Sequence, residues 1–290
     1  MIRIKDIMTK IRLAAFALCI LSIKVLPNST ATKDSYSEDG FLILGQDDLV
    51  GITFWIATAA MLGSSIFFLI ERSNVAPQWK TSMTIATLIT GIAFWHYMYM
   101  REHWILTGES PIVYRYVDWF ITVPLQIVEF YFILAAVTAV TAMLFWRLLG
   151  ASILMLVFGF LGETQMIGGS SIIWWILGMV CWFYIIYEIF RGEAAILNEK
   201  SGNEAGQFAF QALKWIVTIG WAIYPIGYLY GLDETVILGV KISNTAYSPE
   251  LINIIYNLAD LINKTAFGVA IWIAAVKDTK DSKGKQSFMF

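Results

Sequence analysis

Seven apolar segments, each long enough to cross a lipid bilayer, restrict the fold of this chain more than any other feature. Inside a bilayer each segment must satisfy its own backbone N–H and C=O groups, so each is expected to be helical. A chain that is 58% hydrophobic and 14% charged fits this class of protein. We predict an all-α membrane protein with a seven-transmembrane-helix bundle, with spans at residues 49–71, 81–100, 112–136, 147–165, 171–190, 208–230 and 250–276.

The loops and the two ends of the chain predict its orientation in the membrane and its division into segments. Nine Lys and Arg residues lie in the loops on one side and in the C-terminal tail, against three on the other side, which predicts an outside N-terminus and a cytoplasmic C-terminus. The N-terminal region has the basic, apolar and small-residue order of a secretory signal, with an uncleaved anchor as the alternative. This organisation fits a bacterial inner membrane. We expect a signal peptide (1–31), a polar extracellular tail (32–48), a helical domain (49–278) and a cytoplasmic tail (279–290).

Other classes of protein find no support in the sequence. A net charge of −2 and the lack of a basic tract with interleaved aromatics give no sign of nucleic-acid binding. No Gly-rich phosphate loop, Ser-His-Asp arrangement or zinc-ligand spacing is present, so we predict neither an enzyme nor a metal site. Cys19 and Cys181 lie far apart in apolar segments, and no disulfide framework is readable from them.

Ionisable residues inside the third span are the first candidates for function, because a charge at bilayer depth costs about 3 kcal/mol unless it is paired or hydrated. Asp118 and Glu129 are 11 residues apart, almost three helical turns, which places them on one face about 16 Å apart. Thr122 lies one turn inward of Asp118 on the same stripe, and Arg115 lies one turn outward. The spacing predicts two acids on one side of a helix with an opening between them.

The seventh span carries an acid and an amine one turn apart, Asp260 and Lys264. A buried lysine loses solvation and becomes a nucleophile that can form a Schiff base with an aldehyde. The protonated Schiff base is a cation, and Asp260 and Asp118 are the available counterions. The alternative is a structural pair in which Asp260 and Lys264 only neutralise each other.

Aromatic residues in the third and sixth spans suggest a cavity for a long, flat cofactor. Trp119 follows Asp118, and the sixth span carries Trp221, Tyr224 and Pro225. We expect Pro225 to kink that helix and free backbone groups, as proline does at functional sites in membrane helices. Packing in the core or an interfacial aromatic belt is the alternative reading for most of these rings.

Together with "TGIAFWHYMYMR", "YRYVDWFITVPLQIVEFYFILAA", "GWAIYPIGY" and "IYNLADLINKTAFG", these residues make the chain resemble the microbial rhodopsins, specifically the blue-absorbing proteorhodopsins, over about residues 49–278. The resemblance implies that all-trans retinal is bound to Lys264 as a protonated Schiff base. It further implies that Asp118 is the primary proton acceptor and counterion and that Asp260 is the second counterion. Glu129 would be the proton donor, which with Asp118 and Thr122 completes the signature of an outward proton pump.

The resemblance also assigns finer roles. His96 would hydrogen-bond the acceptor and tune its pKa, and Gln126 stands where the family carries Gln in blue-absorbing members; a packing role for Gln126 is the alternative. Trp175 occupies the position where Gly admits a carotenoid antenna, which argues against such a partner. Trp55 matches a tryptophan that contacts the histidine of the next protomer in pentameric or hexameric rings, with a lipid-facing belt position as the alternative.

The sequence therefore predicts a light-driven outward proton pump that works in a lipid bilayer. The alternative is a sensory photoreceptor that signals to a transducer, although a sensor would usually not keep the carboxylate donor that Glu129 supplies. A seven-helix receptor without retinal leaves Lys264 unexplained.

Overall fold

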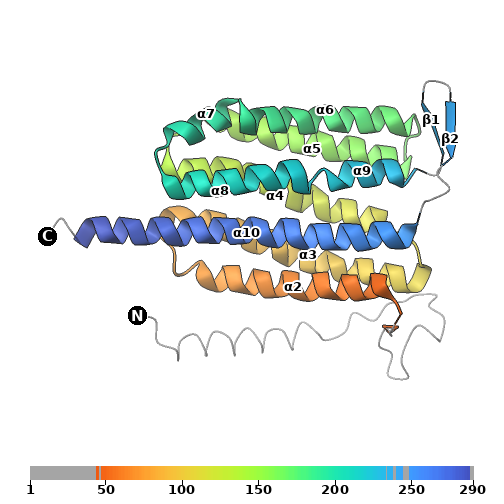
Figure 1. Ribbon diagram of the computed structural model, residues 1–290, viewed down its shortest axis with the longest axis horizontal. Coiled ribbons are helices and arrows are strands. Elements are labelled where there is room, and N and C mark those ends of the chain that lie inside the picture. The colour runs from red at the N-terminus through yellow and green to blue at the C-terminus, as the bar shows by residue number, and fades with distance from the viewer. Residues whose placement is uncertain (1–43, 46, 233, 238–239, 244–247, 288–290) are drawn as a thin grey trace. The chain divides into compact units, whose positions relative to one another are not determined.

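The computed structural model describes the chain from residue 44 to 287 apart from residues 46, 233, 238–239 and 244–247, so the expected signal peptide lies outside the described residues, as does most of the expected tail. The described chain is helical except for one hairpin (Figure 1). Its elements are α2 (Leu49–Glu71), η2 (Pro77–Trp79), α3 (Lys80–Thr107), α4 (Ile112–Val137), α5 (Ala142–Thr164), α6 (Ser171–Phe190), α7 (Glu193–Lys200), α8 (Glu204–Trp215), η3 (Ile216–Gly220), α9 (Ile223–Tyr230), β1 (Glu234–Ile237), β2 (Val240–Ser243) and α10 (Pro249–Ser287).

The seven predicted spans all correspond to helical stretches, and the seven-helix bundle is confirmed. In the described part of the chain, six stretches are long and apolar enough to cross a membrane, and α3 is not among them. α3 is 28 residues long and packs between α2 and α4. Its polar residues Thr90, His96 and Tyr97 are buried in the bundle rather than turned to lipid, which explains why a helix of lower hydropathy can complete the set.

Local signals fix several helix ends. The Asp48 carboxylate accepts the Gly51 N–H at 2.7 Å and so caps the start of α2. α3 ends at Thr107 and is capped by Gly108, whose φ of 67° is the left-handed conformation that glycine adopts most readily. Asn203 accepts the Gly206 N–H at 2.8 Å at the start of α8. The fourth span begins at Ala142, five residues before the expected start, because the break falls at the threonine-rich stretch that precedes it.

The sixth span is interrupted, and its break lies ahead of the proline that we expected to cause a kink. α8 passes into the π-helical segment η3, in which the Trp221 N–H donates to the Ile216 carbonyl at 3.1 Å, and α9 begins only at Ile223. A proline ring clashes with the carbonyl four residues before it, which for Pro225 is Trp221. The break begins at Ile216, nine residues before Pro225, and the proline ring acts only near its C-terminal end, at Trp221.

The long outer loop and the last helix complete the architecture. The loop at residues 231–249 contains a hairpin, with β1 and β2 antiparallel and Thr235 opposite Ile242. α10 continues to Ser287 (Figure 1), so most of the stretch expected to be a tail (279–290) is helical.

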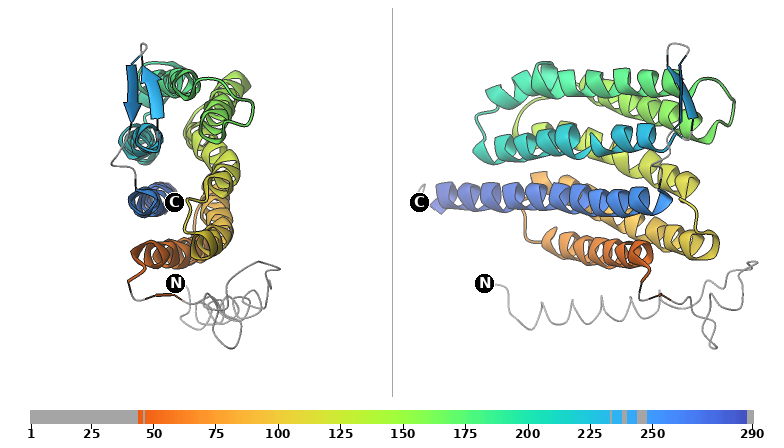
Figure 2. Two further views of the ribbon diagram at one scale, coloured as in Figure 1. Left: turned by 90° about the vertical axis from the view of Figure 1, so that its right-hand side faces the viewer. Right: turned by 45° about the vertical axis from the view of Figure 1, so that its right-hand side comes forward.

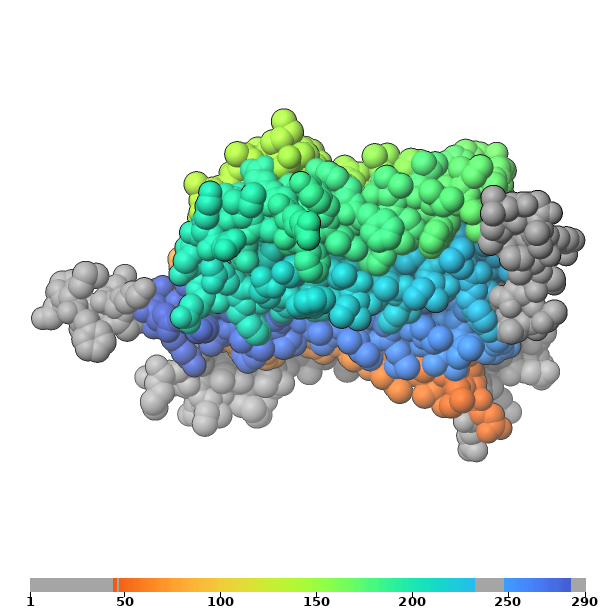
Figure 3. Space-filling model, turned by 45° about the horizontal axis from the view of Figure 1, so that its top comes forward, coloured from red at the N-terminus to blue at the C-terminus, as the bar shows by residue number. Residues whose placement is uncertain are grey.

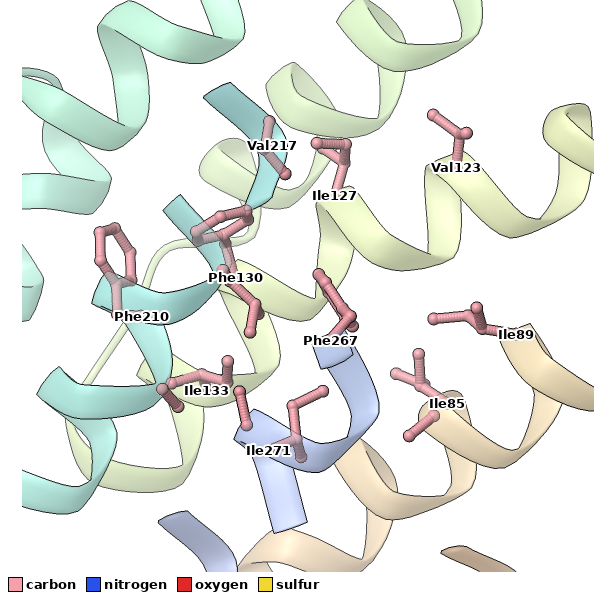
Figure 4. Packing of buried hydrophobic residues seen from close by; sticks show 14 of the residues in the cluster. Ile85, Ile89, Val123, Ile127, Phe130, Ile133, Phe210, Val217, Phe267 and Ile271 are labelled. Atoms are coloured by element: carbon pink, nitrogen blue, oxygen red, sulfur yellow. The ribbon is translucent and has the colours of Figure 1, made fainter. Parts of the chain in front are cut away.

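The core of the bundle is apolar and lies where α4, α8 and α10 face one another. Phe130, Phe210 and Phe267 are fully buried there, and Figure 4 shows them converging with Ile133 and Ile271. Seen along the helices, α10 lies between α2 and the pair of α8 and α9 (Figure 2). One face of α10 is exposed, at Ile255 and Ile262 among others, whereas Asp260 and Lys264 lie on the face that is buried against its neighbours and so are removed from lipid.

Candidate functional site

The centre of the bundle holds one amine between two carboxylates. Lys264 Nζ donates to Asp118 Oδ2 and to Asp260 Oδ2, each at 2.8 Å. These three residues come from α4 and α10 and are at most 2% exposed. The structure thus brings the acid of the third span against the acid and amine of the seventh. The two carboxylates favour a cation at the position of the Lys264 amine.

Asp118 has few other partners. His96 Nδ1, from α3, lies 3.3 Å from Asp118 Oδ1. The Thr122 hydroxyl donates mainly to the Asp118 backbone carbonyl at 3.0 Å and lies 3.4 Å from Oδ2. Its carboxylate therefore depends on the Lys264 amine and on His96, and both are groups whose protonation can change.

Asp260 is held much more firmly. The Tyr97 hydroxyl donates to Oδ2 at 2.8 Å, and the Tyr224 hydroxyl donates to Oδ1 at 2.6 Å. Trp119 Nε1 donates to Oδ2 at 3.3 Å. Hydrogen bonds to a carboxylate favour its charged form. The two acids thus have different surroundings, because two tyrosine hydroxyls and an indole N–H donate to Asp260 and none of these donates to Asp118 in the described chain. Sequence reasoning missed Tyr97, although it directly follows His96.

Arg115 is turned outward rather than toward Asp118. Its Nη2 donates to Asn253 Oδ1 and Asn257 Oδ1, both at 2.8 Å, and its Nη1 donates to the Tyr97 hydroxyl at 3.4 Å. The residue is 1% exposed. The two asparagines are one turn apart on α10, and that spacing was the available signal for this clamp. Arg115 reaches the acid pair only through Tyr97.

Glu129 is isolated inward along α4. It is fully buried, and Ser82 of α3 is its polar neighbour. Within the part of the chain that is described, neither carboxylate oxygen makes a hydrogen bond of ordinary geometry. A buried carboxyl without a charged partner is far cheaper to hold in its neutral form, which carries a proton.

A mostly apolar cavity extends from Lys264 toward α5 and α6. The predicted residues Trp119, Gln126, Trp221, Tyr224 and Pro225 all line it. Further walls come from residues that sequence reasoning did not place there, namely Tyr116, Met155, Gly159, Glu163, Gly178 and Trp182. The cavity can hold an apolar molecule that reacts with an amine at Lys264.

Side chains from neighbouring helices satisfy the carbonyls around the break in the sixth span. Trp182 Nε1 donates to the Val217 carbonyl at 3.1 Å, and Trp175 Nε1 donates to the Pro225 carbonyl at 3.0 Å. Asn263, next to Lys264, donates to the Gly220 carbonyl at 3.1 Å. A Cβ on Gly220 would lie 2.1 Å from Asn263 Oδ1, so glycine is required for this close approach.

Trp55 lies on the outer surface of the bundle. It is 45% exposed, and the Arg101 guanidinium carbon lies 4.1 Å from the centre of its ring. Its ring therefore packs against a cation of α3 in the same chain, and part of it stays available to lipid or to another molecule.

Comparison with known proteins shows extensive similarity. A family model described as "Bacteriorhodopsin-like protein" matches residues 48–278. The chain is 48% identical over 237 residues to a blue-light absorbing proteorhodopsin of Gamma-proteobacterium Hot 75m4, covering 81% of this chain and 89% of that protein. It is 46% identical over 241 residues to a green-light absorbing proteorhodopsin of Gamma-proteobacterium EBAC31A08, covering 82% and 91%.

Its fold is also similar to a crystal structure of the blue light-absorbing proteorhodopsin from Med12. The TM-score is 0.66 at 54% identity, over 80% of this chain and 100% of that one. The two relatives described as blue-light absorbing are thus 48% and 54% identical to this chain, against 46% for the green-light absorbing one.

Proposed function

This chain belongs to the bacteriorhodopsin-like protein family, and from that premise we propose that it is a light-driven outward proton pump of the proteorhodopsin type. The observation that carries the proposal is the contrast between two buried acids on α4. Asp118 lies 2.8 Å from Lys264 Nζ with few other partners, whereas Glu129 is isolated toward the cytoplasmic side.

The cavity residues fit the retinal that this family implies, and we propose the all-trans isomer. Lys264 would bind it covalently, since its amine is the reactive group in the cavity wall. Trp119, Trp221, Tyr224 and Pro225 would hold the polyene. When bound, retinal supplies light absorption and an isomerisation that changes the surroundings of the Lys264 nitrogen.

The protein side chains then define a path for one proton. Asp118 accepts it from the Lys264 nitrogen at 2.8 Å. Asp260 remains an anion because two tyrosine hydroxyls and an indole N–H donate to it. Glu129 returns a proton to the nitrogen from the cytoplasmic side. Since Asp118 is the outer acid and Glu129 the inner one, net movement is outward.

A sensory photoreceptor is the less favoured reading, because the buried Glu129 serves a pump and has no use in a slow signalling cycle. Illumination of cells that express the protein with added retinal tests the choice. We expect acidification of the medium that a protonophore abolishes. Light-induced absorbance changes lasting seconds, without any change in pH, would instead support the sensor.

We propose blue absorption on the evidence of Gln126. Its Nε2 is buried and has no hydrogen-bond partner within the described chain, and the residue lines the cavity. A polar amide there stabilises positive charge near Lys264 in the ground state and widens the energy gap. Gln126→Leu should therefore move the absorption maximum toward green and preserve pumping, while the control Gln211→Leu, outside the cavity, should change neither. An unmoved maximum would assign Gln126 to packing.

We expect His96→Ala to lower the pH at which added acid shifts the absorption maximum to the red. That colour change reports protonation of Asp118, and His96 Nδ1 lies 3.3 Å from its carboxylate. If His96 Nδ1 accepts a hydrogen bond from the protonated Asp118 carboxyl, it favours the protonated form, and its removal makes protonation require more acid. The measurement is a spectral titration beside wild type, with His103→Ala, the other histidine of α3, as control. Equal midpoints in His96→Ala and wild type would remove His96 from this role.

The remaining proposals concern the membrane, the oligomeric state and a second chromophore. We propose a multi-pass protein of the bacterial inner membrane that assembles into a pentamer or hexamer through Trp55, with the 7% of His96 that is exposed as its contact on the next protomer. The partial exposure of Trp55 supports this oligomer, and the native mass of Trp55→Ala tests it.

A carotenoid antenna is not expected, because Trp175 of α6 donates to the Pro225 carbonyl and fills that wall of the cavity.

A further inference from the structure

The last turn of α8 carries a lysine, next to the inner end of α6, that the proposed pump does not use. Lys214 Nζ lies 4.5 Å from the centre of the Phe190 ring, and Trp215 packs on the same ring with centroids 5.7 Å apart. Within the described residues, Lys214 has no carboxylate partner. Its ammonium group instead contacts the aromatic face of Phe190, which attracts a cation without neutralising its charge.

The depth of Lys214 in the membrane is set by the helices around it. Hydrocarbon about 30 Å thick requires about 20 helical residues. α6 is 20 residues long and ends at Phe190, and counting 20 residues back from Tyr230 along the sixth span reaches the neighbourhood of Gln211. Lys214 therefore lies close to the inner edge of the hydrocarbon, while α7 and the start of α8 extend beyond it.

A groove of about 690 Å³ opens beside Lys214 on the face formed by α6, α7, α8 and α10, which is turned to the viewer in Figure 3. Phe190 and the 46%-exposed Phe208 supply its apolar walls. Gln211, one turn before Lys214, lines the groove with an exposed amide that makes no hydrogen bond in the described part of the chain. An apolar wall thus adjoins a cation and a free amide donor.

The acidic residues of the groove do not compensate Lys214. Glu204 already receives a hydrogen bond from Lys277 Nζ at 2.9 Å, so this pair is neutral as a unit. Glu199 is exposed on α7, beyond the expected membrane edge, where water hydrates it. At the level of the hydrocarbon edge the groove is therefore positive.

We propose that this groove binds one anionic phospholipid of the cytoplasmic leaflet. Lys214 and Gln211 would hold the phosphate, and Phe190 and Phe208 would pack against the glycerol and the start of an acyl chain. Anionic lipid is favoured over a soluble anion because Lys214 lies where lipid phosphates are concentrated, and each lysine near that surface contributes about 1 kcal/mol. The proposal requires the membrane orientation but not the pump activity.

Native mass spectrometry of the full chain with bound retinal, released from nanodiscs of equimolar phosphatidylglycerol and phosphatidylcholine, tests the proposal. We expect wild type and Lys214→Arg to retain phosphatidylglycerol preferentially. Lys214→Gln should lose about five-fold in apparent affinity, the factor that one lysine near the surface represents. The matched control is Lys80→Gln, a half-buried lysine on the same membrane side at the start of α3. Unchanged visible absorption confirms that each variant is folded.

Several results would overturn the proposal. Equal retention of the two lipids by wild type would remove the site, and an equal loss in Lys80→Gln would reduce it to general surface charge. Displacement of the lipid by inorganic phosphate would identify a site for a soluble anion. Loss of oligomer mass in Lys214→Gln, with lipid retention unchanged, would show that a second copy of the chain covers the groove.

Discussion

Lys264→Ala is expected to give a protein without visible absorption when it is purified with added retinal. The Lys264 amine is the reactive group in the cavity wall, and no other lysine lines this cavity in the described chain. Removing it also leaves Asp118 and Asp260 buried without their cation. Loss of one partner from a buried charged group costs about 3–5 kcal/mol, so the variant should also be less stable at neutral pH.

Lys264→Arg separates the chemistry from the charge. The guanidinium keeps a cation between the acids but does not form the imine, so this variant should be colourless and more stable than Lys264→Ala. The measurements are the visible spectrum and thermal unfolding followed by helical circular dichroism. Lys277→Ala, at the exposed end of α10, should keep full colour. A visible band that survives in either Lys264 variant would refute the attachment site.

Much of the fold follows from hydropathy, because a bilayer allows few alternatives to spanning helices. All seven predicted stretches are helical, yet α3 was the segment that hydropathy supported least. Its polar residues Thr90, His96 and Tyr97 are inside the bundle. Hydropathy averages over both faces of a helix and cannot tell a polar residue turned to a neighbour from one turned to lipid.

The candidate site was predictable where charge marks it. Asp118, Asp260 and Lys264 were identified because ionisable residues at bilayer depth are costly, and the structure brings them within hydrogen-bond distance. The neutral partners were not predictable in the same way. Asn253 and Asn257 carry no charge that would mark them, and Arg115 is long enough to reach either Asp118 or the asparagines.

The position of the helix break also needed tertiary information. Pro225 identifies the correct span, but the π-helical segment at Ile216–Gly220 depends on Asn263 of α10 packing against Gly220 and on Trp182 of α6 donating to Val217. These contacts join segments that are more than 30 residues apart in sequence. A pattern read along one helix contains no record of them.

Asp118→Asn is expected to shift the absorption maximum to the red and to reduce light-driven acidification by about 100-fold or more, the range for loss of a positioned proton-transfer group. The Asp118 carboxylate lies 2.8 Å from the Lys264 nitrogen and stabilises positive charge on that nitrogen in the ground state. The substitution removes this negative charge. It also removes the proposed proton acceptor. Both effects come from one carboxylate, so they should appear together.

Asp260→Asn is the matched comparison, because Asp260 lies at the same 2.8 Å distance from Lys264 Nζ. Tyr97 and Tyr224 both donate to Asp260, whereas neither tyrosine donates to Asp118, so we propose that Asp118 is the acid that takes up the proton. The acid-induced red shift should therefore vanish in Asp118→Asn and persist in Asp260→Asn. Spectral titration with proton-transport assays on both variants decides the assignment. Acidification retained by Asp118→Asn at neutral pH, or a colour titration lost only with Asp260, would make Asp260 the acceptor and require the two tyrosines to release it.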